Sequence, residues 1–228
     1  MLSEEQKSNQ PYHHGNVKEA LIRVALELME NNQVDLISLR RLSKEVGVTP
    51  SAVYNHFTDK DALMLAIKTR VYEEFNQFFE ERISDSNDPE ESLLEMCLAY
   101  YHFSKEHPSR FQFLFSSVLP MEWSTPETVE VFCRCLVRAR KFVLGIYEKY
   151  QIPCSEEELV NATLLVWSQL HGIVTLRNSG SIQAAVAYQD WPTSCALVHD
   201  HEVERLIKSH RDNLVNGILN SPRSESHH

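Results

Sequence analysis

The apolar positions between residues 38 and 60 repeat at the spacing of two short helices joined by a turn. In the first half they lie three and four residues apart, on one helix face: Leu39, Leu42 and Val46. Gly47 follows where a helix end favours a residue that tolerates left-handed backbone. Thr49 then offers an N-cap oxygen, and Pro50 suits the first helical position because its missing N–H would have no partner there.

The second helix is predicted over residues 49–57, with Val53 and Phe57 four residues apart on its buried face. The pattern therefore predicts a helix-turn-helix, a motif that can place its second helix in the major groove of DNA. The alternative is a solvated helical hairpin without a ligand.

The outward faces of both predicted helices carry side chains that suit DNA. Arg and Lys neutralise phosphates, Asn bonds base edges, and Tyr and Thr hydroxyls reach phosphates. We predict contacts to bases and groove edges from Ser51, Tyr54 and Asn55. The remaining predicted contacts, to phosphates, a base edge or a thymine methyl group, come from Arg40, Arg41, Lys44, Thr49, Pro50, His56 and Lys60.

With its flanking helices, this stretch resembles the N-terminal domain of the TetR family of bacterial transcriptional regulators. The segment Tyr54–Phe57, followed by Lys60 and Leu63, fits the family's Y-x-H-F-x-x-K-x-x-L pattern position for position. Two further segments resemble one subgroup, whose C-terminal domain is named for its Trp, His and Gly: Tyr12-His13-His14-Gly15-Asn16 and Trp167-x-x-x-His171-Gly172. The resemblance implies a DNA-binding domain at residues 12–70 and a regulatory and dimerisation domain at residues 71–220.

Helical spacing dominates the whole chain, which contains only 6 Gly among 228 residues. We therefore predict an all-α fold of about nine helices, with a three-helix N-terminal domain and a C-terminal helical domain. The fourth helix is predicted from about residue 58 to residue 83 and is shared between the domains. Residues 178–198 are predicted to be irregular, and the last helix is predicted over residues 199–219.

The charge is unevenly distributed along the chain. Residues 1–70 contain 9 Lys and Arg and 9 Asp and Glu, so the whole formal net charge of -10 lies in the remainder. Phosphates would repel that acidic part, and DNA contact is therefore expected only in the N-terminal domain.

Five Cys in a chain of this length favour reduced thiols in a cytoplasmic protein. The first 15 residues are polar, and no apolar run approaches the roughly 18 residues that span a bilayer, so neither a signal peptide nor a membrane partner is predicted. We expect a bacterial cytoplasmic protein that is associated with the nucleoid when bound to DNA.

The aromatic residues between positions 100 and 115 either line a ligand cavity or form ordinary core, and the residues alone leave both open. The family resemblance implies an effector pocket in this region, for which the candidates are Tyr100, Phe103, Phe111, Phe115, Trp167 and His171. The predicted helices 155–177 and 199–219 resemble the family's dimerisation pair. The second has an apolar stripe that we assign to the dimer interface: Val203, Leu206, Ile207, Leu214 and Ile218.

No nucleophile elbow, Gly-rich phosphate loop or paired metal motif is present in the sequence, so we predict no catalytic residue, no metal site and no cofactor. Cys133 and Cys135 would point about 200° apart on a helix, which favours structural or surface thiols. The predicted function is a ligand-responsive homodimeric repressor, released from a palindromic double-stranded DNA operator by a small-molecule effector. An activator, an enzyme and a non-specific DNA-binding protein are the alternatives.

Overall fold

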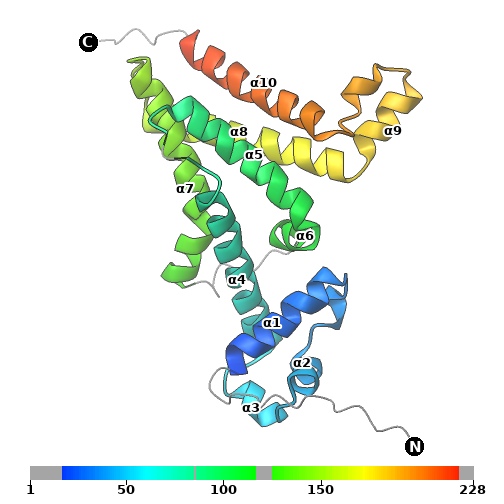
Figure 1. Ribbon diagram of the computed structural model, residues 1–228. Coiled ribbons are helices and arrows are strands. Elements are labelled where there is room, and N and C mark those ends of the chain that lie inside the picture. Colours follow the sequence, from blue (N-terminus) through cyan, green and yellow to red (C-terminus); the bar gives the residue numbers. More distant parts are fainter. Residues whose placement is uncertain (1–16, 85, 117–124, 221–228) are drawn as a thin grey trace, which may run out of the picture. The chain divides into compact units, whose positions relative to one another are not determined.

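The computed structural model describes residues 17–84, 86–116 and 125–220. Within these ranges the prediction of an all-α fold is confirmed, because the chain forms ten α-helices, two short 3-10 helices and no strand (Figure 1). The chain divides into two compact units, Met1–Arg70 and Val71–His228. The segment Tyr12–Asn16, which contributed to the predicted subgroup, lies outside the described residues.

The N-terminal unit consists of three helices and the first half of a fourth. They are α1 (Val17–Glu30), α2 (Leu39–Val46), α3 (Pro50–Tyr54) and α4 (Lys60–Glu80), with the 3-10 helix η1 (Val34–Leu36) after α1. Helix α1 packs against both α2 and α3. The apolar faces of all four helices are buried in one small core that includes Leu21, Met29, Leu42, Val53, Leu63 and Ile67. This core fixes how α2 and α3 present their outer faces.

The helix α3 ends at Tyr54, three residues before the predicted end, and Asn55 is its C-cap. The next bond is of the tighter 3-10 type, from the N–H of His56 to the carbonyl of Val53 at 2.9 Å, which closes the regular helix. Phe57 is nevertheless buried as predicted. The helix α4 is shorter at both ends than the sequence predicts.

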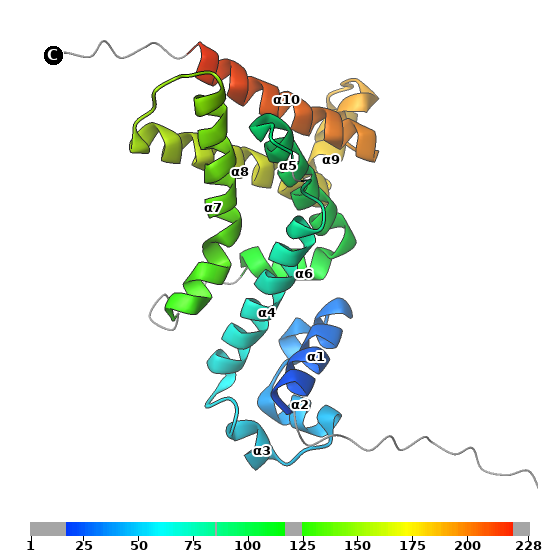
Figure 2. The same cartoon turned by 60° about the vertical axis from the view of Figure 1, so that its left-hand side comes forward.

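The C-terminal unit contains the second half of α4 and six further helices. They are α5 (Pro89–Glu106), α6 (Pro108–Ser116), α7 (Pro126–Lys149), α8 (Glu156–Asn178), α9 (Ser181–Tyr188) and α10 (Asp200–Leu219), with the 3-10 helix η3 (Thr193–Cys195) before α10. Helix α5 is the centre of this unit, because it packs against α6, α7, α8 and α10 (Figure 2). Helices α5, α7 and α8 begin at capped serine, threonine or aspartate residues, as their sequences predict.

The prediction that residues 178–198 are irregular is wrong, since α9 occupies eight of them. Gly180 adopts a left-handed backbone with a φ of 74° and is the N-cap of α9. The segment that follows is rich in alanine, which favours a helix, and Val186 anchors it by being buried. Glycine and serine before a segment are typical of a loop, but here they form only the turn between α8 and α9.

Helix α8 is apolar on two sides, which the sequence reading underestimated. It is long and apolar enough to cross a membrane by length and composition, although only 28% of the apolar window is buried within the chain. Asn161, Ser168 and Gln169 interrupt its apolar positions, and one such helix is weak evidence for a membrane span. One side of α8 contributes Leu159, Val166, Leu170 and Val174 to the core, while Leu164, Leu165 and Leu176 are exposed on another.

Candidate functional site

Local hydrogen bonds and one left-handed glycine shape α2, α3 and the turn between them. The Ser38 hydroxyl accepts a hydrogen bond from the N–H of Arg41 at 3.3 Å and thereby caps α2. Gly47 ends α2 in the left-handed region with a φ of 77°. The Thr49 hydroxyl then accepts from the N–H of Ala52 at 3.2 Å, with Pro50 as the first residue of α3. These contacts form the predicted helix-turn-helix.

The ten predicted DNA contacts all lie on the surface of the N-terminal unit. Nine of the side chains are exposed and Arg41 is partly buried. Tyr54 is 58% exposed at the end of α3, although its ring is large and apolar. Burying such a ring against a partner is favourable, so its position is typical of a contact surface. The structure places these side chains but contains no DNA, and their individual contacts stay predictions.

Arg41 has a partner that the sequence reading overlooked. Its guanidinium lies 3.4 Å from the carboxylate of Glu45, one helical turn further along α2. Both side chains are about 40% exposed or more, and pairs of this kind contribute little to stability. A DNA phosphate can therefore compete with Glu45 for Arg41, but Lys44 is the simpler candidate for a contact to the DNA backbone.

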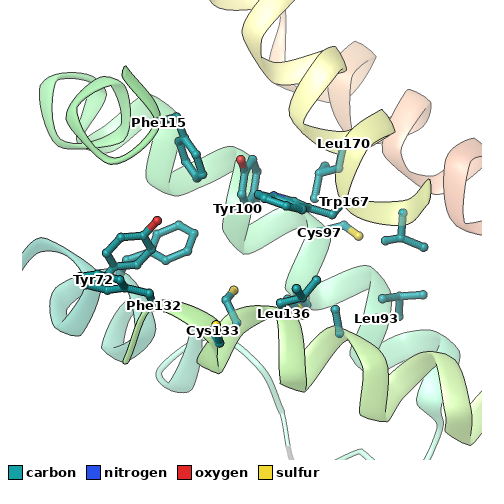
Figure 3. A pocket seen from close by; sticks show the side chains of 15 residues that line it. Tyr72, Leu93, Cys97, Tyr100, Phe115, Phe132, Cys133, Leu136, Trp167 and Leu170 are labelled. Carbon is teal, nitrogen blue, oxygen red and sulfur yellow. The ribbon is translucent and has the colours of Figure 1, made fainter. Parts of the chain in front are cut away.

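A cavity of about 180 Å³ lies within the C-terminal unit, between helices α4, α5, α7 and α8. Its labelled side chains come from different helices and converge on one space (Figure 3). The described residues that line it are aliphatic, aromatic, methionine or cysteine: Tyr72, Phe75, Leu93, Met96, Cys97, Tyr100, Phe115, Phe132, Cys133, Cys135, Leu136, Ala139, Val166, Trp167 and Leu170.

The six predicted effector residues divide into three groups. Tyr100, Phe115 and Trp167 line the cavity as predicted. Phe103 does not, because it is 1% exposed and packs edge-to-face on Phe75 and Phe78, so its assignment to the pocket is wrong and it is core. The other two, Phe111 and His171, line a second and more open cavity of about 870 Å³ that Phe115 also borders.

A chain of hydrogen bonds joins the walls of the two cavities. Burial lowers the pKa of His171, and its Nδ1 lies 2.7 Å from the Tyr100 hydroxyl in a hydrogen bond whose direction depends on the tautomer of the ring. The other ring nitrogen, Nε2, lies 3.3 Å from the hydroxyl of Thr175. His171 is thus a hydrogen-bonded wall residue, and its partner Tyr100 lines the first cavity.

The sequence reading missed most of the cavity wall. Tyr72 and Phe75 lie on α4, which was considered only as a connection, and Phe132, Cys133 and Cys135 lie on α7. The spacing of three between Tyr72 and Phe75 marks a buried face of α4, but nothing in the sequence says that α4 and α7 meet the same space. The sequence contains these five aromatic and cysteine residues, but it does not show that they are neighbours in the folded chain.

The predicted dimer residues on α10 need correction. Val203 and Ile207 are fully buried and Ile218 is 4% exposed, because this face of α10 packs against α5 and α8 within one chain. These three therefore cannot belong to a surface interface. Leu206 and Leu214 remain partly exposed. An uncharged surface lies instead on the outer face of α8, formed by Asn161, Leu164, Leu165, Ser168, Thr175 and Leu176, which we call the α8 outer face.

One buried and one half-buried histidine predict that the protein loses stability in mild acid. Burial lowers the pKa of His171 and of His210 below the ordinary 6.5, although a hydrogen bond to the Val166 carbonyl opposes the shift at His210. As the pH falls through 6.5, the unfolded chain binds protons that the folded chain does not, so the free energy of unfolding decreases until the folded pKa values are passed. His210→Gln should reduce this decrease between pH 7.5 and 5.5 in urea titrations. An unchanged decrease would contradict it.

Two family descriptions match the chain. Residues 21–67 match the description "Bacterial regulatory proteins, tetR family", and residues 93–191 match "Tetracyclin repressor-like, C-terminal domain". The second range includes Trp167, His171 and Gly172, but its description does not name the Trp-His-Gly subgroup, which stays a prediction.

The chain is also similar to two named regulators. It is 23% identical over 163 residues to an uncharacterized HTH-type transcriptional regulator of Mycobacterium tuberculosis, over 72% of this chain and 71% of that protein. It is 28% identical over 166 residues to another of Bacillus subtilis, over 71% of this chain and 79% of that protein. These names denote transcriptional regulators and not enzymes.

Several solved structures share the fold. A protein of unknown function from Rhodococcus sp. RHA1 has a TM-score of 0.70 at 22% identity, over 91% of this chain and 98% of that one. FadR of Bacillus subtilis, in complex with stearoyl-CoA, has a TM-score of 0.56 at 15% identity, over 87% and 98%. A TetR variant of Acinetobacter baumannii, in complex with minocycline, has a TM-score of 0.55 at 19% identity, over 91% and 98%. At these identities the likeness concerns the fold alone.

Proposed function

The chain belongs to the TetR family of bacterial transcriptional regulators, and we propose that it is a ligand-responsive repressor that binds a palindromic operator as a homodimer. The observation that carries this proposal is the outer face of α2 and α3. This face carries exposed polar and basic side chains and the exposed ring of Tyr54. Both helices are capped, and their inner faces are buried in the core. Ser51, Tyr54 and Asn55 would contact bases and groove edges, and the basic residues would hold phosphates.

We assign the dimer contact to the α8 outer face and the adjacent exposed positions of α10. Leu164, Leu165 and Leu176 are each at least 43% exposed, and the described residues of this face include no charge. On α10, Asn213 and Gly217 are exposed and uncharged and border the same surface depression as Leu165, and Gly217 would allow close approach of a second helix. Two-fold symmetry then presents two copies of α3 to two half-sites about one DNA turn apart.

The effector would act through the cavity that α4 and α8 help to line. Tyr72 and Phe75 belong to α4, which begins at Lys60 in the N-terminal unit. Trp167 belongs to α8, whose outer face carries the proposed dimer contact. An occupant that shifts either helix would change the spacing of the two DNA-binding units. It would release the operator only if it bound the released state more tightly than the DNA-bound state.

Salt dependence provides one test of the phosphate contacts. Lys44→Ala should weaken binding to every duplex and reduce the slope of log K against log salt by about 2 for the dimer, because each subunit loses one phosphate contact worth about 0.9. The measurement is a fluorescence titration at several salt concentrations. Lys208→Ala, which removes an exposed lysine from α10, is the matched control and should leave the slope unchanged. Equal slopes for both variants and the parent would contradict the assignment of Lys44.

A reporter experiment in cells tests whether the protein represses or activates transcription. A reporter placed behind the operator should be expressed more strongly when the gene for this protein is deleted, since we propose a cytoplasmic repressor that occupies the nucleoid when bound to DNA. Weaker expression would instead indicate an activator that uses the same contacts. Equal binding of operator and random duplexes would indicate a non-specific DNA-binding protein.

A further inference from the structure

We propose that the 180 Å³ cavity binds a small, uncharged aromatic molecule that carries one hydrogen-bond acceptor, which the hydroxyl of Tyr72 contacts. This inference rests on the proposed function, because it takes the cavity to be the effector site of the regulator. It adds the size, the charge and the polar contact of the ligand.

The size of the cavity limits the ligand to a single ring with small substituents. An engineered cavity of about 150 Å³ in another protein accommodates benzene, so about 180 Å³ leaves room for one further small group. The wall favours a ring, because it consists largely of aromatic side chains in edge and tilted contact. Tyr72 and Phe132 have centroids 4.6 Å apart, and Phe75 and Tyr100 have centroids 5.9 Å apart.

The described wall of the cavity disfavours charged ligands. Among the fifteen described residues that line it, none is Asp, Glu, Lys, Arg or His. Burial raises the pKa of the Cys97 thiol and of the Cys135 thiol to about 12, and it also raises the pKa of Tyr100, so these groups are neutral at physiological pH. A carboxylate or ammonium group inside would lose its hydration without gaining a counter-charge.

Tyr72 provides the free polar contact. Tyr72 lines the cavity, and burial raises the pKa of its hydroxyl to about 12, so the hydroxyl is protonated and can donate. No described residue accepts a hydrogen bond from this hydroxyl, whereas the hydroxyl of Tyr100 is hydrogen-bonded to His171. An acceptor on the ligand would therefore find one donor, at Tyr72 on α4.

Three probes with one benzene ring each test the requirements for a neutral ligand and for a hydrogen-bond acceptor: methyl benzoate, benzoate and toluene. Isothermal titration of the full-length protein without DNA should show saturable binding of methyl benzoate, with benzoate at least about tenfold weaker. Tyr72→Phe should weaken methyl benzoate at least about threefold and leave toluene unchanged. Benzoate binding as tightly as methyl benzoate, or Tyr72→Phe without effect on methyl benzoate, would overturn the proposal.

A substitution that fills the cavity shows where the probes bind. Ala139 is buried on α7 and lines the cavity, while Val137 on the same helix is 64% exposed. Ala139→Leu should weaken methyl benzoate and toluene at least about tenfold, and Val137→Leu should weaken neither. If Ala139→Leu left both affinities unchanged, the probes would bind elsewhere and the proposal would fail.

Alkylation of Cys133 gives a second measurement on the unsubstituted protein. Its thiol is exposed and borders the cavity, whereas Cys195 is exposed in η3 away from the lining. Methyl benzoate should slow iodoacetamide labelling of Cys133 but not of Cys195, and equal rates with and without the probe would contradict the site. Because no DNA is present, these results are independent of whether the protein binds an operator.

Discussion

Replacing Tyr54 by alanine is expected to weaken operator binding by about 30-fold to 150-fold. The ring is 58% exposed at the end of α3, where it supports no core, so its removal should leave the fold intact. One hydrogen bond in the groove contributes about 1 to 1.5 kcal/mol. A homodimer makes the contact twice, and about 2 to 3 kcal/mol corresponds to that loss of affinity. The measurement is a gel-shift titration on the operator.

Tyr188→Ala is the matched control for this variant. Tyr188 is 86% exposed on α9 in the acidic C-terminal unit, so its removal also takes an exposed tyrosine from a helix. It should leave operator affinity unchanged. Equal affinities for the Tyr54 variant, the Tyr188 variant and the parent would show that α3 does not carry the contact.

Replacing Leu165 by glutamate is expected to convert the dimer into a folded monomer. Leu165 is 56% exposed in one chain, so a glutamate there is solvated in the monomer. In the proposed dimer both copies would be buried without a partner charge, at a cost of about 3 kcal/mol or more each. The dimer dissociation constant should therefore rise at least about ten-thousandfold, measured by sedimentation, and operator affinity should fall with it.

Two further substitutions separate this effect from general damage. Val137→Glu places the same charge at a 64% exposed position of α7 and should leave both the dimer and the operator affinity unchanged. Ile207→Glu places it at a fully buried position of α10 and should prevent folding. A dimeric Leu165→Glu variant would show that the subunits associate through another surface.

The helix-turn-helix could be predicted from the sequence because its determinants are local. The cap at Thr49, the left-handed Gly47 and the apolar spacing of Leu39, Leu42 and Val46 all act within one or two helical turns. The end of α3 was harder to predict, because Phe57 is buried whether the regular helix continues or a tighter 3-10 turn follows. Helix α9 was missed because Gly180 and its neighbouring serines mark a turn whether a loop or a helix follows.

The C-terminal unit was harder to predict because its assignments depend on contacts between distant segments. A helical apolar stripe does not reveal what covers it. On α10, Val203 and Ile207 face the chain's own core, whereas Leu165 on α8 is left exposed. In the aromatic cluster, Phe103 is core and Phe115 lines a cavity, and the packing of α4 and α7 decides between the two.

Selection of bound sequences from a pool of random duplexes tests the central claim most directly. With the full-length protein we expect enrichment of a two-fold symmetric motif whose half-sites are about one DNA turn apart or slightly more. The same selection with the Tyr54→Ala variant should enrich that motif poorly. An enriched single half-site without symmetry, or no enrichment at all, would contradict the account of a homodimeric repressor that reads its operator with α3.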